Sequence, residues 1–201
     1  MKTVTAVTTT GVLGTLFVRK FIKRQSIIPE IDTLERVILG VATAQYGLTF
    51  AFKSDRRIQR YRFLDWLITT PLLLKTFHSL AVHKGFKGRF EIPALFNFLM
   101  IYAGYHAEFL AKSPQEKRLW TYLGFIGLVV VLLYVRRWDV YLKSQGVDTR
   151  QLPTFFYVGW TAYGAIFLLQ NEEARQSAFN VLDLFNKGIY SLHLEAVLAS
   201  L

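Results

Sequence analysis

The chain is divided into apolar stretches about as long as membrane spans, separated by short charged connections. Five stretches contain no charged residue: 3–18, 37–52, 92–107, 119–135 and 152–171. Two more, 63–74 and 178–200, carry charges within them. Several are shorter than the ~20 residues that a straight span needs, so flanking charged side chains must lie at the headgroup level or in a protein-lined cavity. The pattern predicts an all-α membrane protein, a seven-transmembrane helix bundle in which residues 1–201 form a single domain.

Composition supports this class. Hydrophobic residues make up 52% of the chain and charged residues 19%, whereas a typical soluble domain has about 25% charged residues. A net charge of +10 would indicate nucleic acid in a soluble protein, but here the basic residues lie mostly between the apolar stretches, so we expect no nucleic-acid partner. The chain has no cysteine, and its four histidines show no ligand spacing, so we expect no metal site.

The basic residues also orient the predicted bundle. If the N-terminus lies outside, thirteen basic residues flank the inner ends of the helices and nine flank the outer ends, as the positive-inside rule requires. The first stretch ends in a basic group that includes Lys23 and Arg24, which is typical of a stop-transfer flank rather than a cleaved leader. We therefore expect a retained first helix, the N-terminus outside and the C-terminus inside.

Local residues mark the ends of three predicted helices. Asp32 or Thr33 is expected to cap the second helix. Ser113 and Pro114 are expected to break the chain before the fifth, and Pro153 suits the first turn of the sixth.

The two charged stretches hold the residues with the most informative chemistry. An ionisable residue inside a membrane helix is costly and therefore indicates a functional site. Arg62, Asp65 and Thr69 lie at i, i+3 and i+7 and share one face of the third helix, with Arg62 on the outer side. Asp183 precedes Lys187 by four residues, so both project from one face of the seventh helix. The alternative is a structural ion pair within each helix, although such a buried pair often costs more than it returns.

Three segments occur in a recognisable order: RxxDWLxTTPLLL at 62–74, WTAY at 160–163 and LDxxxK at 182–187. Together they resemble the third, sixth and seventh helices of the microbial, retinal-binding rhodopsins. The short loops, small size and charged start of the second helix look most like the viral branch of that family, found in giant viruses of phytoplankton. The resemblance implies all-trans retinal, covalently bound as a Schiff base to Lys187, in an integral multi-pass membrane protein, which would lie in the host cell membrane if the chain is viral.

The resemblance also implies a role for each residue of the site. Asp65 would be the main counterion and proton acceptor, Asp183 the second counterion, and Arg62 the relay of charge toward the outer exit, with Thr69 retained beside Asp65. Residues implied around the polyene are Trp66, Thr70, Leu73, Asn97, Met100, Gly104, Trp160, Tyr163 and Phe167. Leu73 goes with green absorption in this family. For the aromatic residues, plain packing or an interfacial belt is the alternative.

The sequence departs from the family at several positions. Thr76 stands where the best-known proton pumps have a carboxylic acid, so reprotonation from the inside needs another donor. We expect this to be Glu35, at the inner start of the second helix beside the third; the alternative is an ordinary first-turn glutamate. Glu172 and Glu173 lie where relatives carry outer proton-release carboxylates, or they form a solvated loop pair. Gly164 replaces a proline common in relatives, so the sixth helix is expected to bend less or differently.

Two transport functions compete. The first is a light-driven outward proton pump, favoured by Arg62, Asp65, Thr69 and Asp183. The second is a light-gated cation channel of the viral rhodopsin type, which the missing acid at Thr76, together with Glu35 and Asn186, keeps open. A photosensor and a retinal-free structural protein are further alternatives, and no enzymatic activity is expected. The expected partners are the lipid bilayer, protons or monovalent cations, and further copies of the chain in a pentamer or trimer, as relatives commonly form.

Overall fold

The computed structural model describes residues 2–22, 26–51 and 56–201, and within these ranges it contains helices and no strand. Lys23, Arg24 and Phe52, which the sequence places at the ends of two spans, lie outside the described residues. The first five helices are α1 (Lys2–Ile22), α2 (Pro29–Ala51), α3 (Arg56–His83), α4 (Glu91–Phe109) and α5 (Pro114–Ser144). They are followed by α6 (Leu152–Thr154), η1 (Phe155–Trp160), α7 (Thr161–Phe167), α8 (Glu172–Asp183), η2 (Leu184–Ile189) and α9 (Tyr190–Ala199).

These elements form seven helical rods. The π-helix η1 continues α6 into α7 without a break, and the π-helix η2 continues α8 into α9 in the same way. Five single helices and two composite ones therefore confirm the predicted all-α bundle of seven helices. Among the described residues, α5 is the helix long and apolar enough to cross a membrane by length and composition alone.

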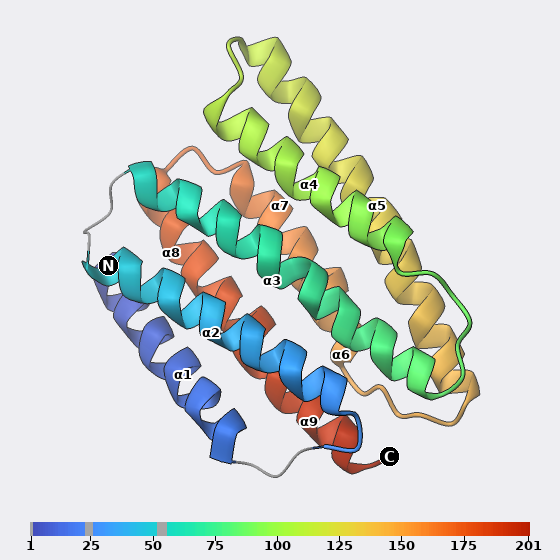
Figure 1. Ribbon diagram of the computed structural model, residues 1–201. Coiled ribbons are helices and arrows are strands. Elements are labelled where there is room, and N and C mark those ends of the chain that lie inside the picture. The colour runs from blue at the N-terminus through green and yellow to red at the C-terminus, as the bar shows by residue number, and fades with distance from the viewer. Residues whose placement is uncertain (1, 23–25, 52–55) are drawn as a thin grey trace.

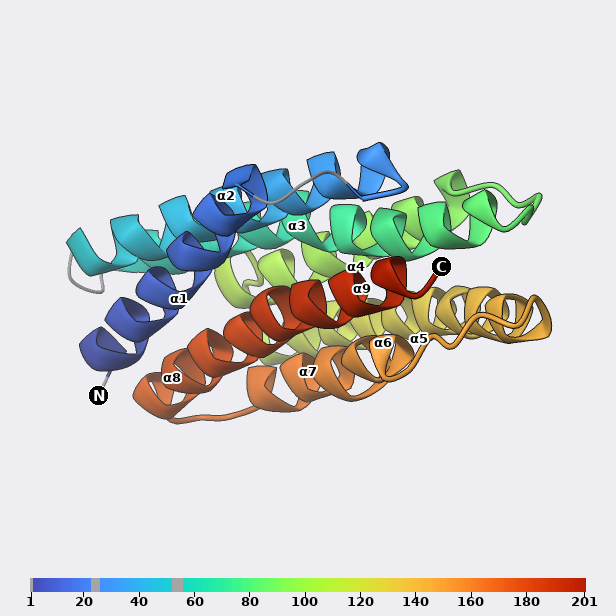
Figure 2. The same cartoon turned by 90° about the horizontal axis from the view of Figure 1, so that it is seen from below.

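The rods close into a ring. Each of the first five helices packs against the next, α5 contacts η1, α7 contacts α8, and α8 returns to α1 (Figures 1 and 2). The N-terminus lies at one end of the bundle and the C-terminus at the other. We refer to these as the N-terminal end and the C-terminal end.

The expected ends of the fifth and sixth helices are confirmed. Ser113 is the N-cap of α5, and its Oγ accepts a hydrogen bond of 3.1 Å from the backbone N–H of Glu116. Pro114 occupies the first position of α5, where no N–H is needed. Pro153 lies in the first turn of α6.

The expected cap of the second helix is wrong. α2 begins at Pro29, so Asp32 lies inside its first turn and Thr33 directly after it. The Asp32 Oδ2 atom accepts a hydrogen bond of 2.6 Å from the backbone N–H of Ser26. Asp32 therefore holds the connection that precedes the helix, while its negative charge also suits the helix N-terminus.

The sixth helix is irregular at η1, one turn before Gly164. Here η1 packs against η2 of the seventh rod. A Cβ atom built on Gly159 would lie 2.7 Å from Cγ of Asn186, closer than side chains approach in proteins. The absence of a side chain at Gly159 therefore lets the two π-helical turns meet.

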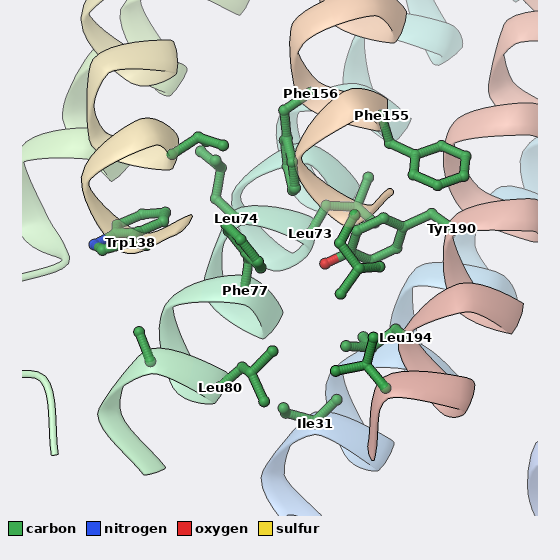
Figure 3. Close-up of a cluster of buried hydrophobic side chains, with 14 of the residues drawn as sticks. Ile31, Leu73, Leu74, Phe77, Leu80, Trp138, Phe155, Phe156, Tyr190 and Leu194 are labelled. Carbon is green, nitrogen blue, oxygen red and sulfur yellow. The ribbon is translucent and has the colours of Figure 1, made fainter. Parts of the chain in front are cut away.

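A large apolar cluster fills the C-terminal half of the bundle (Figure 3). Its side chains come from α2, α3, α5, η1 and α9 and point toward one another. The labelled members are Ile31, Leu73, Leu74, Phe77, Leu80, Trp138, Phe155, Phe156, Tyr190 and Leu194. The Tyr190 hydroxyl, visible within the cluster, lies 2.8 Å from Oγ1 of Thr76, so its polar atom has a partner.

Candidate functional site

A buried amine flanked by two carboxylates lies at the middle of the bundle. Lys187, in η2, is 2% exposed. Its Nζ donates a hydrogen bond to Oδ2 of Asp65 on α3 and lies 3.6 Å from Oδ1 of Asp183. The structure therefore brings together the charged residues of both stretches. Since each carboxylate stabilises the ammonium, the cost of burying that charge is partly offset.

The two carboxylates have different surroundings. Asp183 is fully buried and accepts hydrogen bonds from the hydroxyls of Tyr46 and Tyr163 and from Nε1 of Trp66, the last at 3.1 Å. Asp65 is bonded to Lys187 through Oδ2, and its Oδ1 has no hydrogen-bond partner within the described part of the chain. Asp183 is therefore fixed by three donors, whereas Asp65 keeps free acceptor capacity.

Arg62 lies on the N-terminal side of this pair and contacts Asp183. Its Nη1 is 3.8 Å from Oδ2 of Asp183 and 3.5 Å from the hydroxyl of Tyr46, and its Nη2 donates to Oδ1 of Asn180 at 2.7 Å. Among the described residues no ion pair joins Arg62 to Asp65. The alternative of a structural pair between these two residues is therefore wrong, because the guanidinium has turned toward the seventh rod.

Sequence reasoning missed Tyr46 and Asn180. Tyr46 lies in an uncharged apolar stretch, where nothing local distinguishes it from a packing residue. Asn180 lies three residues before Asp183 and therefore on the same face of the helix, so its spacing could have indicated that it belongs to the site.

The hydroxyls near Asp65 bond mainly to backbone. Thr69 Oγ1 donates to the backbone oxygen of Asp65 at 2.9 Å rather than to its carboxylate. Thr70 Oγ1 donates to the backbone oxygen of Trp66 at 2.6 Å and accepts a bond of 2.9 Å from Nδ2 of Asn97. Asn97 thus reaches the site through Thr70.

An apolar pocket extends from Lys187 between the helices. Eight of the residues expected around a polyene line it: Trp66, Thr70, Leu73, Met100, Gly104, Trp160, Tyr163 and Phe167. Further lining residues, which sequence reasoning did not assign to the pocket, are Phe63, Ile101, Thr121, Gly124, Phe125, Leu128, Gly164 and Asn186. A primary amine at the end of a pocket walled by aromatic and aliphatic side chains suits a long apolar aldehyde that condenses with that amine.

Several of the additional pocket residues lie on α5, and they carry no local signal in the sequence. Thr121, Gly124, Phe125 and Leu128 belong to the uncharged stretch 119–135, and only the packing of α5 beside α4 places them at the pocket. Asn186 is different, because the sequence singled it out as a polar residue that favours a channel, although not as a residue of the pocket.

Glu35 lies deep at the C-terminal end of the bundle, and its carboxylate bonds to α1 and α9, whereas a position facing α3 was expected. It is 2% exposed, and its Oε2 accepts a hydrogen bond of 2.6 Å from Nζ of Lys20 on α1. Its Oε1 accepts a bond of 2.5 Å from Oγ of Ser191 on α9. Glu35 therefore faces the first and seventh rods, and the alternative of an ordinary first-turn glutamate is wrong, because α2 begins at Pro29 and Glu35 lies beyond its first turn.

The carboxylate of Glu172 belongs to an ion-pair network at the N-terminal end. Glu172 pairs with Arg175, which also donates to Oε1 of Glu108 at 2.6 Å. Oε1 of Glu172 accepts bonds from Gln59 at 2.6 Å and Gln176 at 2.7 Å. Glu172 is therefore not a loop residue without partners: it lies in the first turn of α8 and links α8 to α3 and, through Arg175, to α4. Glu173 itself is exposed.

Comparison with known proteins agrees with this arrangement. The family described as bacteriorhodopsin-like protein matches residues 1–201. Archaerhodopsin-1 of Halorubrum ezzemoulense is 28% identical over 161 residues, which are 72% of this chain and 60% of the relative. The chain thus spans about 60% of the length of the curated relatives that it matches.

Solved structures share the fold over almost the whole chain. The rhodopsin of Exiguobacterium sibiricum has a TM-score of 0.84 at 17% identity and covers 99% of this chain and 96% of its own. A light-driven proton pump from Leptosphaeria maculans has a TM-score of 0.82 at 19% identity, with coverage of 100% and 96%. The viral rhodopsin OLPVRII has a TM-score of 0.79 at 23% identity, with coverage of 99% and 98%.

The match over residues 1–201, the seven-rod bundle and the buried lysine at the end of an apolar pocket lead to one conclusion. The chain belongs to the bacteriorhodopsin-like family of microbial rhodopsins, integral membrane proteins that bind retinal through a Schiff base to a lysine.

Proposed function

We propose that this protein is a light-driven outward proton pump, with retinal on Lys187, the N-terminal end outside and the C-terminal end inside. The observation that carries the proposal is the buried contact between Nζ of Lys187 and Oδ2 of Asp65. When bound, all-trans retinal supplies a Schiff-base proton that becomes available for transfer after light absorption. Nζ of Lys187, the atom that would carry that proton, is hydrogen-bonded to the Asp65 carboxylate, which is the arrangement that proton transfer needs.

Asp65 is the acceptor in this mechanism, and Asp183 is the fixed counterion. Asp65 can take the proton on Oδ2. Its Oδ1 atom has no hydrogen-bond partner in the described part of the chain, so the charged form of Asp65 is stabilised by fewer donors than that of Asp183. Asp183 accepts from Trp66 and from two tyrosine hydroxyls, and these donors stabilise the carboxylate. The charge at Asp183 therefore stays in place while the charge at Asp65 changes.

Arg62 connects the acceptor to the outer side. Transfer of the proton neutralises both Asp65 and the nitrogen on Lys187, and it leaves the carboxylate of Asp183 facing the Arg62 guanidinium at 3.8 Å. The change in charge alters the balance of forces on the guanidinium, which lies on the side of the site nearer to the Glu172 network. Arg62 is thus placed to favour release of a proton outward, with Glu172 and Arg175 at the exit.

The apolar cluster supports a pump rather than a channel. It fills the C-terminal half across five rods, and Leu73 belongs both to it and to the pocket wall. A channel needs a continuous polar path, whereas a pump needs access to the site from one side at a time. Glu35, behind this barrier and bonded to Ser191 one turn beyond Lys187, is the proposed donor for reprotonation from the inside.

A light-gated cation channel is the second candidate. It is favoured by the polar side chains Ser191, Glu35, Lys20 and Glu195, which follow one another toward the C-terminal end beside the apolar cluster. If the helices that carry these polar side chains moved apart after illumination, cations could pass between them.

A voltage-clamped photocurrent distinguishes the two. A pump drives outward current against a modest opposing voltage, and the current changes little when the cation gradient is inverted. A channel reverses at the equilibrium potential of the permeant ion, which would refute the pump. Lys187→Ala is the control for currents that do not come from the pigment.

Three finer assignments belong to the same proposal. The closed ring of seven rods supports a single domain over residues 1–201. The buried glutamate near the start of α2 supports membership of the viral branch, which would place the protein in a host cell membrane. Assembly into pentamers or trimers in the bilayer, expected from the resemblance, is tested by the mass of the pigment after mild detergent extraction.

A further inference from the structure

One buried lysine joins two glutamates at the C-terminal end of the bundle. Nζ of Lys20 lies 2.6 Å from Oε2 of Glu35 and 2.7 Å from Oε1 of Glu195. The lysine side chain is 5% exposed, and those of the glutamates are 2% and 9% exposed. Arg19 pairs with the other oxygen of Glu195 at 3.1 Å, and its own side chain is 51% exposed. The cluster therefore runs from a buried acid to the surface.

These residues are in line with Lys187. Lys187, Ser191 and Glu195 follow one another at i, i+4 and i+8 along the seventh rod, so they share one face over about 12 Å of helix. Ser191 bonds to Glu35, and Glu195 bonds to Lys20. The face of the seventh rod that carries the Schiff-base lysine is thus continuous with the cluster.

The resting contacts of Glu35 do not suit a proton donor. A donor must hold a proton, but Glu35 has an ammonium on one oxygen and a donated hydroxyl on the other, and both stabilise its carboxylate form. A buried ion pair is also weak evidence for stability, since apolar side chains would often serve as well. The arrangement requires a step that separates Lys20 from Glu35 before Glu35 can donate.

We propose that Lys20 is a positioning residue that controls when Glu35 is charged with a proton, an inference that rests on the proposed pump. At rest Lys20 holds Glu35 as a carboxylate. After illumination Lys20 shifts its bond to Glu195, which it already contacts, and Glu35 takes one proton from the inner aqueous side. Glu35 gives that proton to the nitrogen on Lys187, becomes a carboxylate again and recovers Lys20, so charge and protons balance over the cycle.

The proposal predicts opposite effects for two neutralising variants. In Lys20→Met the buried Glu35 has lost its cation and takes up a proton in the dark. Recovery of the resting absorption after a flash should then be faster and much less dependent on pH. We expect about tenfold, the factor that ~1.4 kcal/mol on a barrier produces. In Glu195→Gln the carboxylate that receives Lys20 after illumination is lost, so Lys20 leaves Glu35 less readily and recovery should be slower by a similar factor.

Two further variants complete the set. Lys20→Arg keeps the charge and should restore the pH dependence that Lys20→Met removes. Lys75→Met is the matched control, because Lys75 forms a more exposed ion pair with Glu30 at 3.4 Å near the same end; it should leave recovery unchanged. A purely structural Lys20 would make Lys20→Met and Glu195→Gln change recovery in the same direction, or not at all, and either result would overturn the proposal.

An infrared difference spectrum separates this inference from the proposed function. A protonated carboxyl band that disappears in Glu35→Gln should be gained on illumination in the unmutated protein and already be present in the dark in Lys20→Met. If these bands occur but no outward transport is measured, the pump is wrong and the control of Glu35 by Lys20 stands. If outward transport occurs and the dark band is missing in Lys20→Met, the role of Lys20 is wrong.

Discussion

Replacing Asp65 by asparagine should shift the absorption of the pigment to longer wavelength and abolish outward proton transport. The substitution keeps the shape of the side chain and removes its charge. In the unmutated protein the cation on Lys187 has Asp65 in direct contact and Asp183 at 3.6 Å, while Arg62 is 3.8 Å from the same Asp183. Asp183 is therefore shared between two cations, and Asp65 is the carboxylate that serves Lys187 alone.

The expected size follows from these distances. Two unit charges about 4 Å apart interact by roughly 4 kcal/mol at the effective dielectric constant of about 20 that suits protein sites. The distances from Asp183 to its two cations are nearly equal, 3.6 and 3.8 Å, so Asp183 balances Arg62 as well as Lys187. Removing Asp65 thus destabilises the ground-state cation by an amount of order 4 kcal/mol. Light absorption moves positive charge away from Lys187, so the excited state loses less, and the transition energy falls by less than that amount.

Absorption spectra and light-induced pH changes measured on the same samples test this reasoning. Asp139→Asn is the matched control, because Asp139 is also buried but bonds to Thr149 at 2.7 Å near the C-terminal end of α5, away from the pocket. It should change neither colour nor transport. An unchanged spectrum in Asp65→Asn, together with a shifted spectrum in Asp183→Asn, would show that the two carboxylates have the opposite roles.

Three further outcomes are expected. Lys187→Ala should give no visible pigment with added all-trans retinal, whereas the unmutated protein should absorb green light; a hydroxylamine-sensitive pigment in the variant would place the Schiff base elsewhere. Glu35→Gln should slow recovery of the resting absorption after a flash, and added azide should partly restore it; recovery equal to that of the unmutated protein at every pH would exclude Glu35 as donor. Gly159→Ala should destabilise the pigment by about 1–3 kcal/mol, the usual cost of overpacking, because the new Cβ would lie 2.7 Å from Cγ of Asn186. Thermal bleaching should show this loss, and Asn186→Ala in the same chain should reverse it. Equal bleaching temperatures in Gly159→Ala and the unmutated protein would show that the two π-helical turns do not touch.

Residues 3–18, 37–52 and the other apolar stretches determined the all-α bundle from the sequence alone. This follows because a chain in a bilayer must satisfy its own backbone hydrogen bonds, and a single long apolar stretch does so within itself as a helix. Helix ends set by local chemistry were also predictable, as Ser113 and Pro153 show. The start of α2 was missed because Pro29 begins the helix before Asp32 and Thr33 are reached.

The charged residues of the site could be named from the sequence because charges in apolar segments are rare and costly. Spacing also placed Asp183 and Lys187 on one face. The partnership with Tyr46 could not be predicted, since Tyr46 lies on another rod in an uncharged stretch, whereas Asn180 could have been suspected from its spacing to Asp183. Contacts between rods depend on their rotation and approach, which no single segment encodes.

Glu35 shows most clearly where prediction from the sequence ends and the effect of tertiary packing begins. Its position near the inner start of α2 was evident from the sequence, and its burial was a reasonable hypothesis. Whether it faced α3, as expected, or Lys20 and Ser191, as found, depended on how α1 and α9 pack beside α2. The helical period fixes which residues share a face, but only the closing of the ring decides which neighbour each face meets, and a buried carboxylate behaves according to that neighbour.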